Sequence, residues 1–278
     1  MRRRRPLKKF GSLSGRRRRI FFIRLTFLAL IGSLTLLFAV WFSHRPQFQI
    51  KYISIRGMVS VLPDGLEELI DAHLAGSVIG LFPRSNVLFV SREKIRDVIM
   101  SSSKRIKAAH VETEGLHSLI ITLDERLPRS LWCRPPREAV PEQCFYMDAE
   151  GFVFDSAPNF NQSGYTRFYG FLGEAGEPYG KTYLSPERFR EITSFLGALK
   201  AVDLAASSFT ATSDGEYHIS LERGTKLMLN SEADFDLVLG NISSLISDPE
   251  LKELFQRNPL PFEYIDLRLG NKVFYRKK

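Results

Sequence analysis

The sequence is poor in the side chains that build metal centres and nucleophilic active sites, with only two cysteines and five histidines among 278 residues. The histidines are scattered, and none has a second ligand-type residue at metal-binding spacing on a helix face. They are His44, His73, His110, His117 and His218. Glycine-rich phosphate-binding loops are also absent. We therefore expect a protein that is not an enzyme, with no catalytic residues, no cofactor and no metal site.

Two groups of charged residues come nearest to a catalytic constellation. The first, Asp124–Arg126, precedes Pro128 at the end of a predicted strand, where a solvated or ion-paired corner is the simpler interpretation. The second consists of Asp266 and Arg268, which are two positions apart on a predicted strand and so share a face of it. We expect both groups to pair with neighbouring side chains and to have structural roles.

Acidic residues are absent from the first 45 positions, which hold twelve of the 39 lysines and arginines. Residues 46–278 therefore carry 27 basic and 31 acidic side chains, a net charge of −4, although the whole chain has a formal charge of +8. A basic tail, residues 1–19, can bind anionic lipid headgroups. The attraction is worth about 1 kcal/mol for each basic residue near the membrane surface. Nucleic-acid binding by the tail is the alternative, but membrane topology alone explains the charge, and we expect no nucleic-acid partner.

The stretch Leu25–Phe42 is eighteen residues long and contains no charged side chain. As a helix it would be about 27 Å long, close to the thickness of the bilayer's hydrocarbon core. Arg24 can snorkel to the interface, which extends the span back to Ile20. A buried core helix would normally carry a polar face, and this stretch has none. The sequence thus predicts one transmembrane helix over residues 20–43.

The charge on either side of this span predicts its orientation. Basic residues cluster before it, and the first charges after it are a lone Arg45 and then Lys51. The N-terminus is therefore expected in the cytoplasm and residues 46–278 outside. A cleaved signal peptide is the alternative, but no small-x-small cleavage site follows the apolar run at Val40–Ser43. An uncleaved signal anchor, in a single-pass protein of the cytoplasmic (inner) membrane, fits better.

The two cysteines, Cys133 and Cys144, both lie in the external part of the chain, eleven positions apart. In an oxidising compartment such a pair predicts a disulfide. A metal site would need further ligands, and none cluster nearby. Two free, buried thiols remain the other possibility.

The first part of the external region reads as strand, helix, helix, strand and strand. Period-two alternation predicts a strand over 48–56, and apolar residues at helical spacing predict a helix from Pro63 with an inward stripe. Ser91 is a suitable N-cap for a second helix. Strands are expected over 106–112 and 118–125, joined through Glu114-Gly115. The helix stripes consist of Leu66, Leu69, Ile70 and Leu74, then Ile95, Val98 and Ile99. This order predicts an α+β unit with a mixed sheet and helices on one face.

The remainder is richer in strands. Hairpins are expected over 145–155, around an Asp148–Gly151 turn, and over 217–229. Ser185-Pro186-Glu187 is typical of a helix start, and a further helix is expected from Ser231. A short strand at 168–172 and a terminal hairpin, with strands 262–269 and 272–276 around Gly270-Asn271, complete the predicted elements.

Several short motifs, in this order after a signal anchor, resemble the FtsQ/DivIB family of bacterial cell-division proteins. They are Ile53-Ser-Ile-Arg-Gly57, Gly80-Leu81-Phe82, the strand from Leu119 to Pro128, the Asp148–Gly151 hairpin and Tyr264-Ile-Asp-Leu-Arg268. The resemblance implies a POTRA domain over 48–127, of β-α-α-β-β order, and a β-rich α+β domain over 128–278. The cysteine pair is not required by the family pattern and looks like a local elaboration.

The resemblance implies a non-enzymatic scaffold of the divisome at the division septum, which recruits other division proteins and helps control septal peptidoglycan synthesis. Partners would be single-span FtsB/FtsL-like proteins held by the last strand, and an FtsK-like protein reached through the POTRA domain. The implied partner surface consists of Leu269, Asn271, Val273, Phe274 and Tyr275. The last strand would need to be an exposed sheet edge; the alternative is an ordinary hairpin packed within its own sheet.

Two other functions are weighed against this one. A POTRA protein of outer-membrane assembly or secretion should bring several POTRA repeats and a long alternating β-barrel pattern, and this sequence has neither. A membrane-tethered wall enzyme would need the catalytic set that the sequence lacks.

Overall fold

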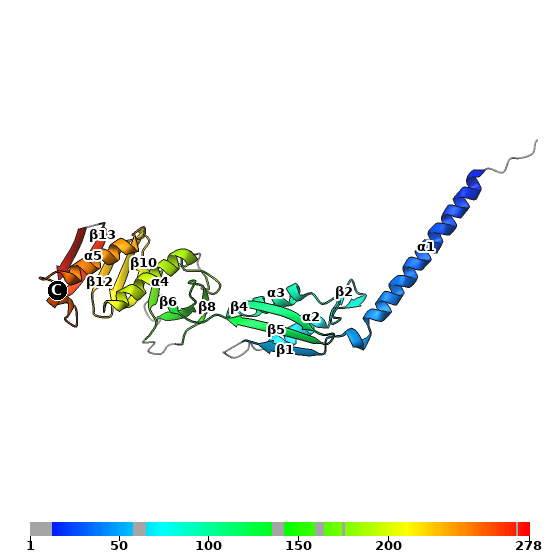
Figure 1. Ribbon diagram of the computed structural model, residues 1–278, viewed down its shortest axis with the longest axis horizontal. Coiled ribbons are helices and arrows are strands. Elements are labelled where there is room, and N and C mark those ends of the chain that lie inside the picture. Colours follow the sequence, from blue (N-terminus) through cyan, green and yellow to red (C-terminus); the bar gives the residue numbers. More distant parts are fainter. Residues whose placement is uncertain (1–12, 58–64, 135–141, 159–163, 174–175, 271) are drawn as a thin grey trace, which may run out of the picture. The chain divides into compact units, whose positions relative to one another are not determined.

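The computed structural model describes residues 13–57, 65–134, 142–158, 164–173, 176–270 and 272–278. It is a mixed α+β structure that begins with one long helix, α1 (Leu13–Ser43) (Figure 1). Within α1, residues Arg17–Ser43 have a mean hydropathy of 2.2 over an eighteen-residue window, none of which is buried by the rest of the chain. This helix is long and apolar enough to cross a membrane. The described residues divide into two compact units, one within 1–102 and 108–123, which includes α1, and the other within 103–107 and 124–278.

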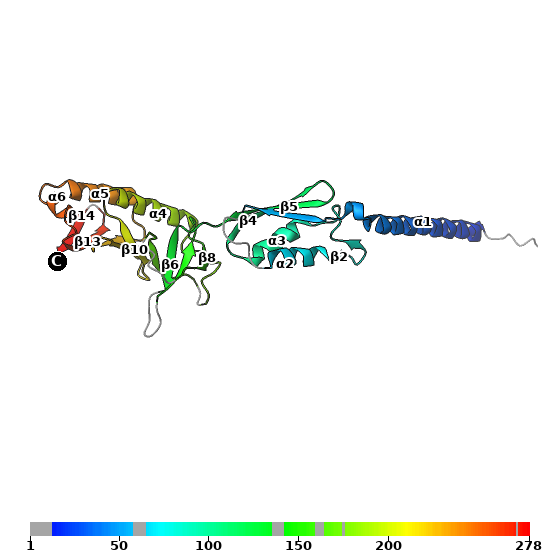
Figure 2. The same ribbon diagram turned by 90° about the horizontal axis from the view of Figure 1, so that it is seen from below.

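The first unit is a three-stranded sheet with two helices on one face (Figure 2). Its strand order is β1-β5-β4, and β1 runs parallel to β5, which makes the sheet mixed as predicted. The core lies between this sheet and the two helices. The elements are the 3-10 turn η1 (Pro46–Phe48), β1 (Tyr52–Arg56), α2 (Leu66–Leu74), β2 (Ser77–Val78), β3 (Phe82–Pro83), α3 (Arg92–Ser102), β4 (Ile106–Glu114) and β5 (Ser118–Glu125).

Two details of this unit differ from the sequence-based expectation. The first strand begins at Tyr52 rather than at residue 48, because Pro46 opens a 3-10 turn there. Leu69 is 46% exposed, whereas Leu66, Ile70 and Leu74 are buried. The buried stripe of α2 therefore follows i, i+4 spacing alone. The predicted helix start at Pro63 lies outside the described residues.

The second unit is built on one nine-stranded sheet, of order β14-β13-β12-β11-β10-β9-β6-β7-β8. Figure 2 shows its three helices on the same face of that sheet. The helices are α4 (Pro186–Ala201), α5 (Phe235–Ser247) and α6 (Lys252–Phe255). The strands are β6 (Ser130–Arg134), β7 (Gln143–Met147), β8 (Val153–Ser156), β9 (Arg167–Gly170), β10 (Ala206–Ala211), β11 (Glu216–Leu221), β12 (Lys226–Asn230), β13 (Phe262–Leu269) and β14 (Lys272–Lys277).

Local signals account for several elements of this unit. Ser185 caps α4, because its hydroxyl accepts a hydrogen bond from the Arg188 N–H at 3.2 Å, and Pro186 occupies the first helical position. Gly151 has a φ of +75° in the turn between β7 and β8, where a Cβ would lie 2.9 Å from the Phe189 ring. The helix predicted from Ser231 instead begins at Phe235, because Asp234 provides its cap.

The core of the second unit lies between the sheet and its helices and is aromatic at its centre. Phe168 on β9 is fully buried, and its ring centroid lies 5.6, 5.2 and 5.3 Å from those of Tyr183, Phe189 and Phe209. Such ring pairs stabilise a core beyond their buried area. This core packs between the sheet and α4 and α5, and the opposite face of the sheet has no described helix (Figure 2).

Candidate partner-binding edge

The last strand, β14, is the terminal strand of the nine-stranded sheet. It pairs antiparallel with β13, and no described strand pairs with its other side. Every second residue of such an edge strand points its backbone N–H and C=O groups away from the sheet, where another chain can pair with them. The exposed edge that the partner-binding hypothesis needs is therefore present in the fold.

Two of the predicted partner residues lie on the helix-covered face of β14. Val273 packs against the main core, and the ring of Tyr275 stands perpendicular to that of Phe262, with centroids 5.4 Å apart. Tyr275 is nevertheless 41% exposed. These side chains tie the edge strand to the core and leave part of the Tyr275 ring available to a partner.

Phe274 lies on the opposite, helix-free face, because side chains alternate along a strand. It is directly opposite Asp266 in the register and is 52% exposed. The structure therefore divides the predicted partner residues between two faces of one edge. Phe274 is the apolar side chain on β14 with the least contact with the unit's own core.

An ion-pair network lies beside Phe274 on the helix-free face. Arg268 donates to Asp266 at 2.6 and 2.9 Å and also to Glu216, which in turn contacts His218 at 3.2 Å. The hydrogen bonds from Arg268 lower the pKa of Asp266 and that of Glu216. The predicted structural role of Asp266 and Arg268 agrees with these contacts, which link β13 to β11 across β12.

Besides the aromatic side chains of β14, the turn between β13 and β14 exposes apolar side chains. Leu269 is 59% exposed, and Gly270 takes a φ of +65°. The Asn241 side chain on α5 donates to the Gly270 carbonyl at 2.8 Å and holds the turn. Leu237, one helical turn before Asn241, is 48% exposed. Asn271, another predicted partner residue, lies outside the described residues.

Leu237 was not among the partner residues expected from the sequence. The signal was available, because Leu237 falls off the i, i+3, i+4 spacing that Val238 and Ile242 satisfy. Single exposed apolar residues are common on protein surfaces. Leu237 is a candidate for contact with a partner because Asn241, one helical turn later, binds the turn that exposes Leu269.

Charged groups close the far end of β14. Lys278 donates from Nζ to the Gly224 carbonyl at 2.9 Å, and its backbone N–H donates to the Pro261 carbonyl at 2.9 Å. Arg276 pairs with Glu263 at 3.2 Å on the exposed surface. The strand is therefore fixed at both ends, and its free edge is preformed.

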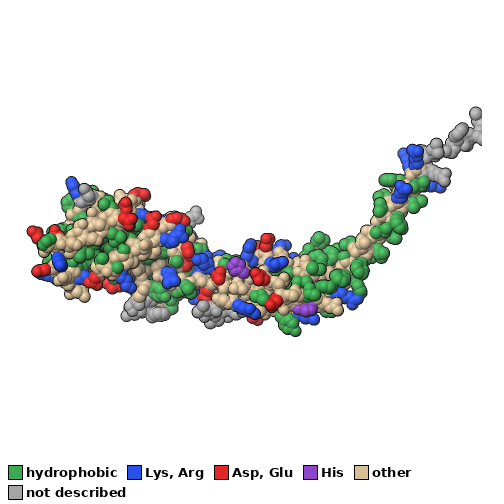
Figure 3. Space-filling view, viewed as in Figure 1, with side chains coloured by type: hydrophobic (Ala, Val, Ile, Leu, Met, Phe, Trp, Pro, Cys, Tyr) green, Lys and Arg blue, Asp and Glu red, His purple; other side chains and the backbone are tan. Residues whose placement is uncertain are grey.

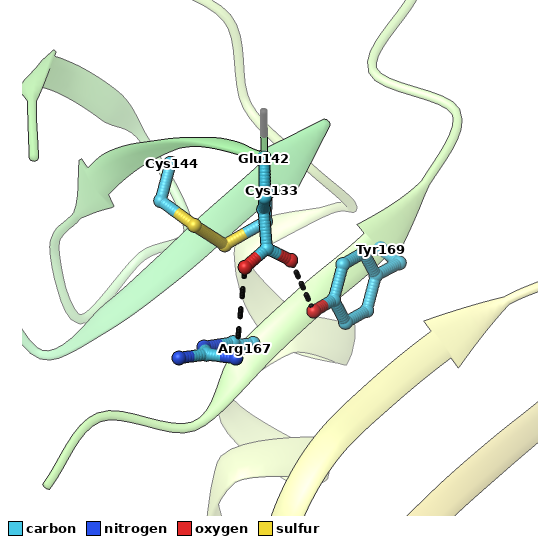
Figure 4. Close-up of a disulfide and its surroundings, with 5 residues drawn as sticks. All are labelled: Cys133, Glu142, Cys144, Arg167 and Tyr169. Carbon is cyan, nitrogen blue, oxygen red and sulfur yellow. Dashed lines mark hydrogen bonds and ion pairs between the residues drawn. A yellow bond between two sulfur atoms is a disulfide. The ribbon is translucent and has the colours of Figure 1, made fainter. Parts of the chain in front are cut away.

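The two cysteines are joined in a disulfide on the neighbouring strands β6 and β7, at the opposite end of the sheet (Figure 4). Glu142 lies beside the bridge, where it accepts from the Tyr169 hydroxyl at 2.6 Å and lies 3.6 Å from Arg167. Burial, followed by the hydrogen bond to Glu142, raises the pKa of Tyr169 to about 12. Because both sulfurs form the disulfide, Cys133 and Cys144 offer no thiolate to a metal ion beside Glu142.

A cleft of about 610 Å³ lies between the C-terminal half of α4 and the starts of β6, β9 and β10. It presents Arg129, Arg167 and Lys200, together with the buried Ser130 hydroxyl, which has no hydrogen-bond partner. Glu222 is the one carboxylate among the described residues that line it, and no histidine is among them. A serine needs an adjacent general base to act as a nucleophile, so these residues offer binding groups without a catalytic set.

The corner formed by Asp124–Arg126 is ion-paired, in agreement with its interpretation from sequence. Arg126 pairs with the buried Asp148, and its guanidinium lies 3.9 Å from the centroid of the Phe152 ring. Glu125 pairs with Arg105 at 3.4 Å. These pairs are structural contacts near the start of the second unit.

No model of a known protein family matches this chain, and no curated protein matches it either. The resemblance to the FtsQ/DivIB family therefore rests on the sequence motifs themselves.

Proposed function

We propose that this protein is a non-enzymatic scaffold of bacterial cell division, a member of the FtsQ/DivIB family that acts by binding other division proteins. It is anchored by α1 in the cytoplasmic (inner) membrane, with its basic tail in the cytoplasm and both units outside. The first unit is a POTRA domain that takes part in recruitment to the division septum, including contact with an FtsK-like protein. The second unit holds FtsB/FtsL-like single-span partners and so helps control septal peptidoglycan synthesis.

The observation that carries this proposal is the position of β14. The family resemblance is most specific at Tyr264-Ile-Asp-Leu-Arg268, which lies within β13, and the next strand is the free edge of the sheet. An edge strand with exposed aromatic side chains combines backbone pairing with apolar contact area, the two sources of affinity in strand-mediated recognition. The mixed α+β fold and the apolar N-terminal helix are consistent with the same family.

A partner on this edge would meet two kinds of surface. Along β14, backbone groups would pair with an added strand, and Phe274 would supply an aromatic anchor. At the turn, Leu269 and Leu237 would form an apolar area on which a helix could pack. A partner with a helix followed by a short extended segment would use both areas.

The test is a pull-down of a co-expressed FtsB-like partner with the full chain carrying Phe274→Asp. A charge at the centre of the interface should reduce recovered partner by about tenfold or more, since a hot-spot substitution costs about 2 kcal/mol or more. Phe274 is preferred to Tyr275, because Tyr275 packs on Phe262 and its replacement would disturb the fold.

The matched control is Phe171→Asp. Phe171 is 79% exposed in the same unit, in the loop after β9, far along the sheet order from β14. Recovery of the partner should be unchanged in this variant. Equal recovery from Phe274→Asp and Phe171→Asp would remove β14 as the binding site.

A further inference from the structure

The short hairpin of β2 and β3 exposes isoleucine at its tip. Ile79 is 86% exposed and has a φ of +54°, a region that a β-branched residue adopts only against steric resistance. Leu81, two positions later, is 42% exposed. Asparagine or glycine would suit this solvent-exposed turn better. Folding of the unit therefore does not explain why isoleucine stands at this position.

A second segment extends the same apolar surface. Leu88 is 66% exposed and Phe89 is 36% exposed. The Phe89 ring stacks on that of Phe82 in β3, with centroids 4.7 Å apart, so the two segments form one surface. We call the four exposed residues Ile79, Leu81, Leu88 and Phe89 the apolar tip.

Hydrogen bonds hold the apolar tip next to the end of α1. The Asn86 side chain is fully buried and donates to the carbonyl of Ser43, the last residue of α1, at 2.7 Å. Its Oδ1 accepts from the Leu88 N–H at 2.9 Å. Val87 N–H donates to the Phe48 carbonyl at 2.8 Å, and the Phe48 ring lies 4.7 Å from that of Phe42. In Figure 3, apolar side chains gather where α1 ends.

The charges around the apolar tip match a lipid headgroup region. Residues 72–92 contain no aspartate or glutamate but do contain Arg84 and Arg92. At the end of α1, the Arg45 guanidinium lies 3.8 Å from the centroid of the Trp41 ring, and both side-chain types favour the interface. Apolar side chains that continue from a membrane span, with basic residues beside them, suit insertion among acyl chains below anionic headgroups.

We propose that the apolar tip inserts into the outer surface of the bilayer beside α1 and forms a second, peripheral membrane contact of the first unit. The occupant is lipid rather than protein, because Asn86 ties the apolar tip to the end of the span itself. The insertion fixes the first unit against the bilayer, so that α1 does not act as a free hinge.

The experiment places a fluorescent probe at the apolar tip of the full chain in nanodiscs of phosphatidylethanolamine and phosphatidylglycerol. Ile79→Trp is made in a Trp41→Phe background, and the lipids carry bromine on their acyl chains near the carboxyl group. The emission of the remaining Trp132, measured in the Trp41→Phe parent in the same lipids, is subtracted. Brominated lipids should quench the added tryptophan by about twofold or more relative to unbrominated lipids, as expected for a side chain at the acyl boundary. Leu88→Trp is a second probe of the same surface.

The control is Ser101→Trp in the same background. Ser101 is exposed in the last turn of α3, about 14 Å along the helix from Arg92. Quenching of the folded Ile79 and Leu88 probes well above that of Ser101 is the expected result. Quenching no greater than that of Ser101 in either folded probe variant would overturn the proposal and leave the apolar tip to a protein partner.

Discussion

The disulfide between Cys133 and Cys144 allows a quantitative test of how the second unit is stabilised. The perturbation is reduction of the bridge, compared with the double variant Cys133→Ala/Cys144→Ala. Cys133 and Cys144 are direct partners in the antiparallel pairing of β6 and β7, so the native hairpin keeps its backbone register without the bridge. The effect is therefore expected mainly in the unfolded chain.

The size of the effect follows from the length of the closed loop. The two cysteines are 11 positions apart. Closing a loop of that size removes unfolded-chain entropy worth about 3 kcal/mol at 25 °C. Because each 1.4 kcal/mol is a factor of ten, reduction should lower the folded-to-unfolded ratio by about a hundredfold. This is a large fraction of the 5–15 kcal/mol typical of a folded domain.

The assay is guanidinium unfolding of the full chain in detergent micelles, followed by the fluorescence of Trp132. This residue is 7% exposed in the core of the second unit, and Trp41→Phe removes the other tryptophan. Reduced protein and the double-alanine variant should both unfold at lower denaturant, by equal amounts. An unchanged midpoint after complete reduction would refute the loop-entropy reasoning. A drop in the variant alone would assign the effect to the loss of the buried sulfurs.

Two further predictions concern polar groups. Asp266→Asn should lower the thermal midpoint at neutral pH, and the gap to wild type should close as the pH falls below about 4. The gap closes at low pH because Arg268 holds the pKa of Asp266 below its ordinary 3.8. The carboxylate therefore stabilises the fold above that pH, and this stabilisation is lost as the pH falls below it. A difference in thermal midpoint that does not change with pH would contradict this prediction. Asn86→Ala should speed hydrogen exchange of the Leu88 amide by about tenfold or more, since that amide loses its buried acceptor. Asn86→Asp keeps the acceptor and should leave that amide protected.

Elements with strong local signals were predicted well. α4 begins where Ser185 and Pro186 indicate, and the β7–β8 and β11–β12 hairpins surround the expected turns. These features depend on neighbours in the sequence, namely a cap, a fixed φ or a glycine with positive φ. The apolar helix at the N-terminus was equally clear, because its segment Leu25–Phe42 contains no charged side chain.

The strand order of the second sheet could not be predicted, because it depends on pairing between distant segments. β9 lies between β6 and β10 and is parallel to both. No local sequence pattern predicts this pairing. β10 was missed altogether, since its sequence is mostly small and polar and Phe209 is its one fully buried residue. That β14 is an edge strand follows from this order and could not be read from its own residues.

Some features of the candidate binding edge could be predicted from the sequence. Period-two alternation alone separates Phe274 from Val273 and Tyr275, so their placement on two faces could have been inferred. The face of the sheet that the helices cover could not be inferred from the sequence, because it depends on how α5 and α6 pack. The tie between Asn86 and Ser43 joins residues 43 positions apart and left no trace in the sequence pattern.

The most direct test of the proposed role in cell division is the location of the protein in dividing bacterial cells. The full chain, with a fluorescent protein fused before residue 1, should form a band at the division site as constriction begins. Uniform labelling of the cell membrane throughout the cycle would contradict a role as a division scaffold.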